Sequence, residues 1–275
     1  MAPGEPYQMT PPCLNIRVVP ETEREAFLAL VVSVNGLASY IRMFRSAVEL
    51  FEYAEVLQEP GISKHQCGNW QLVAARDGAM SMFHFQRILE QSGISLKNCP
   101  TVRALLDHEK LRSARRRFNA VFPDVARVRH AVAHSAEMGE TAANFQRNSF
   151  SGSADLQAVL IEEAKHIRIN NCLMGRRFTT THDGEIIEYE LGYTTLGMLC
   201  SIATEFYDGF SAIDSSPRGW RTSGGDSAPW PQASGKGSFL GGRWGMSLVA
   251  ATGKAAGFVA GWARRLEQRC AFHLN

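Results

Sequence analysis

One short segment gathers the side chains best suited to acid–base and phosphate chemistry. Arg129, His130 and His134 follow a Phe-Pro-Asp sequence at 122–124 that ends one predicted helix and starts the next. At about 100° per residue, both histidines fall away from a stripe of valines that would face the core. Arg129 lies between the histidines and the valine stripe on the helix surface, and its long side chain can bend toward the histidines. Histidine moves protons near neutral pH, and arginine is a permanently charged partner for phosphate.

Two other interpretations of these histidines stay open. They can be a helix-end pair without a catalytic role. Their spacing also lets two histidines share a zinc ion, but the metalloprotease form of that motif needs glutamate directly after the first histidine, where this chain has Ala131. The sequence also has no Cys-x-x-Cys pair and no glycine-rich phosphate loop. We therefore expect neither a metal nor a cofactor.

Basic residues concentrate just before this segment. Between Lys97 and Arg129 there are nine basic and three acidic residues, a local balance of +6 in a chain whose formal net charge is +2. Such a concentration of positive charge predicts a surface that binds the phosphates of a nucleic-acid backbone. A solvated helix face would have the same composition. The candidate RNA-binding residues are Arg112, Arg115, Arg116 and Arg127.

Most elements that position these residues are predicted to be helices. Apolar residues at three- and four-residue spacing recur along much of the chain, between stops at glycine and proline. The motif helix is the fourth of the predicted helices. They span residues 21–60, 67–91, 101–121, 123–138, 154–173 and 194–213, with a polar loop at 139–154.

The remaining segments carry other signals. Asp183-Gly184, flanked by threonine, isoleucine and tyrosine, predicts a β-hairpin at about 176–190. Five prolines in residues 1–20 predict an extended N-terminal arm. The composition of residues 215–275 predicts a Gly/Ser/Pro-rich flexible linker followed by a small-residue C-terminal segment. The predicted fold is therefore mainly α, with one helical domain over residues 21–214.

Composition and apolar runs limit the function classes. Of the 275 residues, 45% are hydrophobic and 20% charged, which excludes disorder along the whole chain. Six scattered cysteines and an N-terminus without signal-peptide features favour the cytoplasm. The apolar run at 26–41 is shorter than the ~20 residues that span a bilayer, and Lys254 interrupts the run at 245–263. We expect a buried core helix at 26–41 and no membrane insertion.

Residues 129–134 (Arg-His-Ala-Val-Ala-His) resemble the Arg-polar-x3-His signature of the HEPN superfamily, small α-helical domains of bacterial toxins, defence systems and RNA-processing enzymes. The order of helices is also similar to that family. The resemblance implies an antiparallel helical bundle and a homodimer whose motif helices face each other across a cleft. It also implies metal-independent RNA cleavage. In that chemistry His134 does the acid–base work, Arg129 binds phosphate and stabilises the transition state, and His130 orients the substrate or contacts phosphate.

We therefore expect a metal-independent endoribonuclease of HEPN type that cleaves RNA through its own 2′-hydroxyl. The resemblance suggests a toxin or defence role, with an antitoxin or regulatory protein as a further partner. The alternative is a non-catalytic, HEPN-like dimeric module that binds RNA, a nucleotide or a protein. The hairpin at 176–190 and the segment after residue 215 are additions to a minimal HEPN domain.

Overall fold

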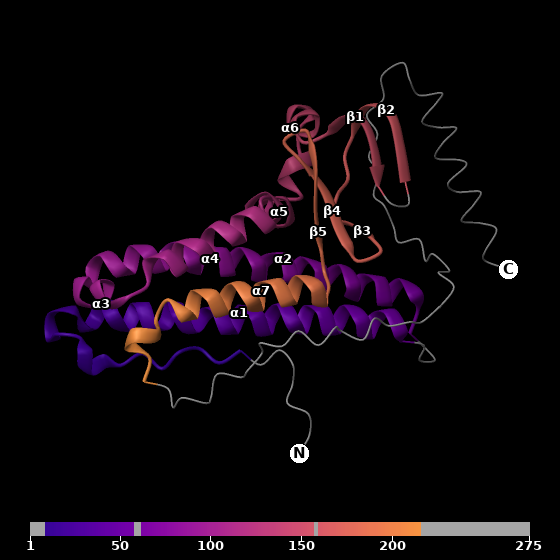
Figure 1. Cartoon of the computed structure of the whole chain (residues 1–275). Coiled ribbons are helices and arrows are strands. Elements are labelled where there is room, and N and C mark those ends of the chain that lie inside the picture. The colour runs from indigo at the N-terminus through magenta and orange to yellow at the C-terminus, as the bar shows by residue number, and fades with distance from the viewer. Residues whose placement is uncertain (1–8, 58–61, 157–158, 216–275) are drawn as a thin grey trace.

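The computed structural model describes residues 9–57, 62–156 and 159–215, and within them the chain is mainly helical, as predicted (Figure 1). Two long helices, α1 (Arg24–Val56) and α2 (Lys64–Ser95), pack side by side over most of their length. The last helix, α7 (Tyr193–Asp208), packs against both α1 and α4 (His108–Val121). These four helices form the main layer of the molecule.

Helix α1 is the central core element, as its apolar spacing predicts. Eleven of its side chains are buried, among them Phe27, Leu30, Val34, Leu37 and Ile41, which recur every three or four residues. By length and composition alone, Glu21–Val56 could also cross a membrane, a test that the core helices of soluble proteins pass as well. Burying each large apolar side chain contributes about 1.5–3 kcal/mol, so packing of this face accounts for the position of the helix.

The predicted helix at 101–121 is two helices. α3 (Pro100–Leu105) ends before the buried Leu106, and α4 begins after Asp107. The Asp107 carboxylate accepts hydrogen bonds from the backbone N–H groups of Glu109 (3.1 Å) and Lys110 (3.2 Å). An aspartate that caps the second helix therefore allows the break that the apolar pattern does not reveal.

The motif helix is shorter than predicted. α5 spans Val125–Ala133, and His134 is its C-terminal cap residue, with a non-helical ψ of 24°. The chain then turns through a short 3-10 helix at Glu137–Gly139 and into α6 (Ala142–Arg147). A helix therefore lies inside the segment that the sequence predicted to be a polar loop.

The β structure is more extensive than the sequence predicted. The helix predicted at 154–173 is wrong, because β1 (Phe150–Leu156) and β2 (Val159–Ile167) form an antiparallel pair there. The hairpin predicted at 176–190 is present as β4 (Arg177–His182) and β5 (Glu185–Glu190), and β3 (Cys172–Met174) pairs with β4 to make a three-stranded sheet. Asp183 and Gly184 both have positive φ, as a tight hairpin turn requires.

The two ends of the described domain are paired. The backbone N–H of Asn15 donates to the Ile213 carbonyl at 2.9 Å, and the N–H of Ser215 donates to the Cys13 carbonyl at 2.8 Å. Between these contacts and α1, the chain forms a short 3-10 helix at Ile16–Val18 and buries Val19. Of the linker and C-terminal segment predicted for residues 215–275, all but Ser215 lie outside the described residues, as do the first eight residues of the arm.

Candidate functional site

Helix α5 presents its histidines because its other face is fixed in the core. Val125, Val128, Ala131 and Val132 are buried, and the helix packs against α2, β4 and β5. The valine stripe predicted from the sequence therefore faces the core. His130, in contrast, is exposed, and His134 is half-buried.

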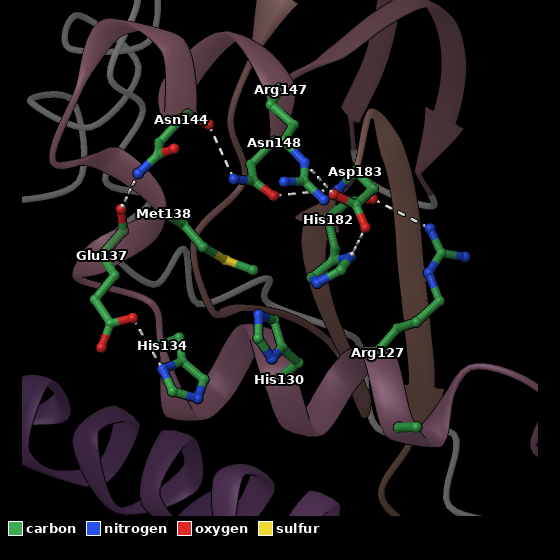
Figure 2. A pocket seen from close by; sticks show the side chains of 11 residues that line it. Arg127, His130, His134, Glu137, Met138, Asn144, Arg147, Asn148, His182 and Asp183 are labelled. Carbon is green, nitrogen blue, oxygen red and sulfur yellow. Dashed lines mark hydrogen bonds and ion pairs between the residues drawn. The ribbon is translucent and has the colours of Figure 1, made fainter.

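Both histidines line an open pocket on the surface, to which other segments of the chain also contribute. The walls come from α5, the 3-10 helix after it, α6 and the β4–β5 turn, around a cavity of about 470 Å³ (Figure 2). Its lining combines imidazole, guanidinium, amide and carboxylate groups. The lining residues are Ala126, Arg127, His130, His134, Glu137, Met138, Asn144, Arg147, Asn148, His182 and Asp183.

Three imidazole rings form a row in this pocket. The ring centroids of His130 and His134 are 4.6 Å apart, and those of His130 and His182 are 5.1 Å apart with the rings nearly perpendicular. The Nδ1 atom of His134 lies 3.0 Å from the Glu137 carboxylate, which fixes the orientation of that ring (Figure 2). Neighbouring imidazoles can accept and donate protons at one bound substrate, which is the chemistry that the motif predicts.

His182 comes from the end of β4 and is nearly buried, with 10% of its side chain exposed. Its Nδ1 atom is 3.1 Å from an Asp183 carboxylate oxygen, but the direction of approach does not make a hydrogen bond. Burial lowers the pKa of His182 below the ordinary 6.5; the charges of His130, Arg127 and Arg147 act in the same direction, against the Asp183 carboxylate. Its neutral form is therefore favoured near neutral pH.

Two arginines border the pocket, and they differ in the contacts they make. The guanidinium of Arg127 is held by ion pairs with Asp124 (2.9 Å) and Glu185 (2.7 Å) and donates to the His182 carbonyl. That of Arg147 contacts Asp183 through Nε at 2.9 Å, and its two terminal nitrogens have no partner among the described residues. Arg147 is therefore the arginine with donors left for an anion.

The structure does not bring Arg129 to the histidines. Its guanidinium carbon lies 5.1 Å from the centre of the Phe83 ring on α2, and Arg129 is not among the residues that line the pocket. Its Nε atom is buried without a hydrogen-bond partner in the described part of the chain. In this conformation Arg129 joins α5 to α2 instead of facing a ligand.

The predicted RNA-binding arginines separate into two places. Arg127 belongs to the pocket, whereas the other three lie exposed on α4. Arg116 and Arg112 both pair with Glu109, and their hydrogen bonds lower the pKa of its carboxyl group. Arg115 is exposed and has no side-chain partner among the residues that the structure describes. The basic face of α4 is thus partly neutralised within the chain.

Among the described residues, no three histidine, cysteine, aspartate or glutamate side chains are grouped closely enough to hold an ion. His130 and His134 share a face, as the sequence predicted, but Glu137 and Asp183 contact different rings. The arrangement favours proton transfer between imidazoles and a substrate.

Sequence reasoning missed His182, Arg147, Glu137 and Asn148. Glu137 comes three residues after His134, whereas His182 comes 52 residues after His130. The fold of the turn after α5, of α6 and of the hairpin brings these side chains to the pocket. Asn148 accepts a hydrogen bond from the Asp183 backbone N–H at 3.2 Å, which ties α6 to the hairpin turn. The one available signal was the His182-Asp183-Gly184 sequence, which places a histidine at the hairpin turn.

Comparisons with known proteins give no relative from which a function could be transferred. No family model matches the chain, and neither a curated protein nor a solved structure matches it.

Proposed function

We propose that the pocket above α5 cleaves RNA without a metal, using the RNA's own 2′-hydroxyl as the nucleophile. The observation that carries the proposal is the contact between His130 and His134, with a third imidazole, His182, beside them. Transesterification needs one group to take the 2′-hydroxyl proton and another to protonate the departing 5′-oxygen. Histidine is suited to both steps near neutral pH.

The contacts support one assignment of roles. His134, oriented by Glu137, removes the 2′-hydroxyl proton, and the oxygen then attacks phosphorus. His130 protonates the 5′-oxygen as the P–O bond breaks, which leaves a 2′,3′-cyclic phosphate and a 5′-hydroxyl. The terminal nitrogens of Arg147 stabilise the added negative charge of the phosphorane. Arg147 thus takes the role that the family resemblance gives to Arg129.

The same proposal extends to the finer class of the fold and to its partners. The Arg-x4-His segment on α5, within a bundle of long helices, supports an HEPN-type domain that acts on RNA as a homodimer. A toxin or defence role, with an antitoxin or regulatory protein as partner, is part of this proposal and follows from the same resemblance.

The test is a cleavage assay on pooled RNA in EDTA, with the full-length chain. We expect 2′,3′-cyclic phosphate ends and no cleavage where the target nucleotide is 2′-deoxy. His134→Ala should lower the rate by about 10²–10⁴-fold, the usual contribution of positioned proton transfer. His166→Ala is the matched control, because His166 is exposed on β2 and does not line the pocket.

A second pair of variants separates the two arginines. Arg147→Ala should reduce the rate at saturating RNA by about 10²–10³-fold, as the loss of a preorganised donor does, while Arg129→Ala should act mainly on folding stability. The position of Arg129 against Phe83 also favours the alternative, a non-catalytic module that binds RNA, a nucleotide or a protein. RNA binding without cleavage, or full activity of His134→Ala, would exclude the enzymatic proposal.

A further inference from the structure

Arg168 is a buried arginine that contacts the turn after α5. It follows β2 directly, and only 8% of the residue is exposed. The next residue, Ile169, fixes the backbone at this point. Its N–H donates to the Thr181 hydroxyl at 3.1 Å, and its carbonyl accepts from the Thr181 N–H at 2.9 Å. Because Thr181 belongs to β4, Arg168 is anchored to the same strand that carries His182.

The guanidinium of Arg168 contacts both ends of the turn. One terminal nitrogen donates to the carbonyl of Ser135, the residue after the C-terminal cap of α5. The guanidinium also packs against Gly139, so closely that a Cβ atom at this position would overlap its other terminal nitrogen. One side chain therefore holds residues 135–139 at their first and last positions.

Burying this charge has a cost that its contacts offset only in part. Burial lowers the pKa of the Arg168 guanidinium, and no carboxylate pairs with it among the side chains that the structure describes. Its compensation is a backbone carbonyl at the C-terminal end of α5, where the helix dipole favours a positive charge. Buried charges are ordinarily paired with an opposite charge. The position of Arg168 is therefore explained better by the turn that it holds than by a gain in stability.

That turn carries Glu137, which determines the protonation of the His134 ring. The Glu137 carboxylate lies 3.0 Å from Nδ1 of His134 (Figure 2). An ionised carboxylate only accepts hydrogen bonds, so this contact places the proton of a neutral ring on Nδ1 and leaves Nε2 free to accept another. The Glu137 side chain is 69% exposed, so the backbone of the turn decides where its carboxylate lies.

We infer that Arg168 is a positioning residue for this pair. By holding the 135–139 turn, it keeps Glu137 against His134 and so keeps Nε2 of His134 unprotonated. The catalytic consequence rests on the proposed function, in which His134 takes the 2′-hydroxyl proton. Arg168 does not line the pocket and acts only through Glu137.

The tautomer of His134 tests this link without RNA. Long-range ¹H–¹⁵N spectra of the full-length chain distinguish the Nδ1–H form from the Nε2–H form at about pH 8, where histidine rings are ordinarily neutral. Wild type should show mainly the Nδ1–H form. Glu137→Ala should shift the ring toward the Nε2–H form, and Arg168→Met should shift it in the same direction.

Gly139→Ala is a second variant, one that keeps the arginine. The added methyl group would take the place of the guanidinium and displace it from Ser135. The φ of Gly139 is not positive, so alanine can adopt the same backbone. This variant should move the His134 tautomer in the same direction as Arg168→Met. Gly93→Ala is the matched control, because Gly93 is exposed on α2 with open space beside it, and it should leave the ring unchanged.

The cleavage assay tests the catalytic consequence. Arg168→Met should lower the rate at saturating RNA by about 10–100-fold with little change in KM, as the loss of an orienting contact does. In a Glu137→Ala background the same substitution should change the rate by less than about threefold, because the group through which Arg168 acts is gone. Arg176→Met is the control for loss of a partly buried arginine, since Arg176 pairs with Glu52 and Glu55 on α1.

Each result supports or overturns the inference. A wild-type His134 tautomer in folded Arg168→Met and Gly139→Ala would overturn it, whatever the RNA assay gives. So would an equal loss of rate with and without Glu137, which is the result expected of a merely structural arginine. A wild-type chain that cleaves no RNA would exclude the proposed function alone, and the tautomer would still decide the role of Arg168. If Arg168→Met does not fold, the spectrum of Gly139→Ala decides.

Discussion

The position of His182 at the end of β4 determines the pKa of its imidazole. The β4–β5 turn places its ring among three cationic or ionisable side chains and removes most of it from solvent. Both effects disfavour the protonated form. A neutral imidazole beside His130 is available as a proton acceptor, so in the proposed mechanism His182 is suited to receive a proton from the neighbouring histidine.

At the level of this residue, we predict a pH-dependent contribution to stability. Because the folded-state pKa lies below that of the unfolded chain, the unfolded state binds more protons between the two values. The free energy of unfolding should therefore fall as pH drops below about 6.5. In urea titrations at pH 7.5 and 5.5, His182→Gln should lose less stability than wild type between the two pH values. An equal loss in both proteins would contradict the prediction, because the other histidines contribute to both.

At the level of elements, α4 depends on the residue that starts it. The Asp107 side chain accepts hydrogen bonds from two backbone N–H groups at the start of α4, so α4 can begin as a separate helix after α3 ends. Asp107→Ala should lower the free energy of unfolding by about 1 kcal/mol, the usual cost of an N-cap. Asp107→Asn keeps the side-chain acceptor and should retain most of that stability in the same urea titration. Equal losses in the two variants would show that the carboxylate charge, and not the cap, is what matters.

The helices could be predicted from the sequence because each buries a periodic face of its own. Phe27, Leu30 and Val34 repeat at helical spacing along α1, and Asp183-Gly184 specifies the β4–β5 turn through local backbone geometry. The β1–β2 pair could not be predicted in this way. Residues 154–165 are rich in alanine, leucine and glutamate, which favour helices, but antiparallel pairing with a neighbouring strand decides their conformation.

The candidate site was predictable only in part for a related reason. His130 and His134 are four residues apart on one helix, so their proximity follows from helical geometry. His182 and Arg147 reach the pocket through contacts between distant segments, and no local pattern encodes those. The direction of Arg129 depends on Phe83, which lies 46 residues earlier in the chain.

At the level of the whole molecule, charge is separated between α4 and the rest of the chain. We predict that Arg115→Gln/Arg116→Gln weakens RNA binding and flattens its dependence on salt, while the rate at saturating RNA stays near wild type. Each lost phosphate contact should reduce the slope of log affinity against log salt by about 0.7 for single-stranded RNA. Because Glu109 already pairs with Arg116, the single variant Arg115→Gln should account for most of the change.

Titrations at several salt concentrations measure this slope directly. Arg87→Gln is a suitable control, since Arg87 is an exposed arginine on α2 that pairs with Glu90. A slope that is the same in wild type and in the α4 double variant would show that this face of α4 does not contact the RNA backbone.

The pairing of Cys13 and Asn15 with Ser215 and Ile213 has a topological consequence. The first and last described segments of the domain are adjacent on its surface, so the two ends of the domain lie close together. A linker of a few residues could join the two ends, and the chain could be reopened at another turn as a circular permutant with the same contacts. For the same reason, the domain could be inserted into a surface loop of a host protein without separating the two sides of that loop.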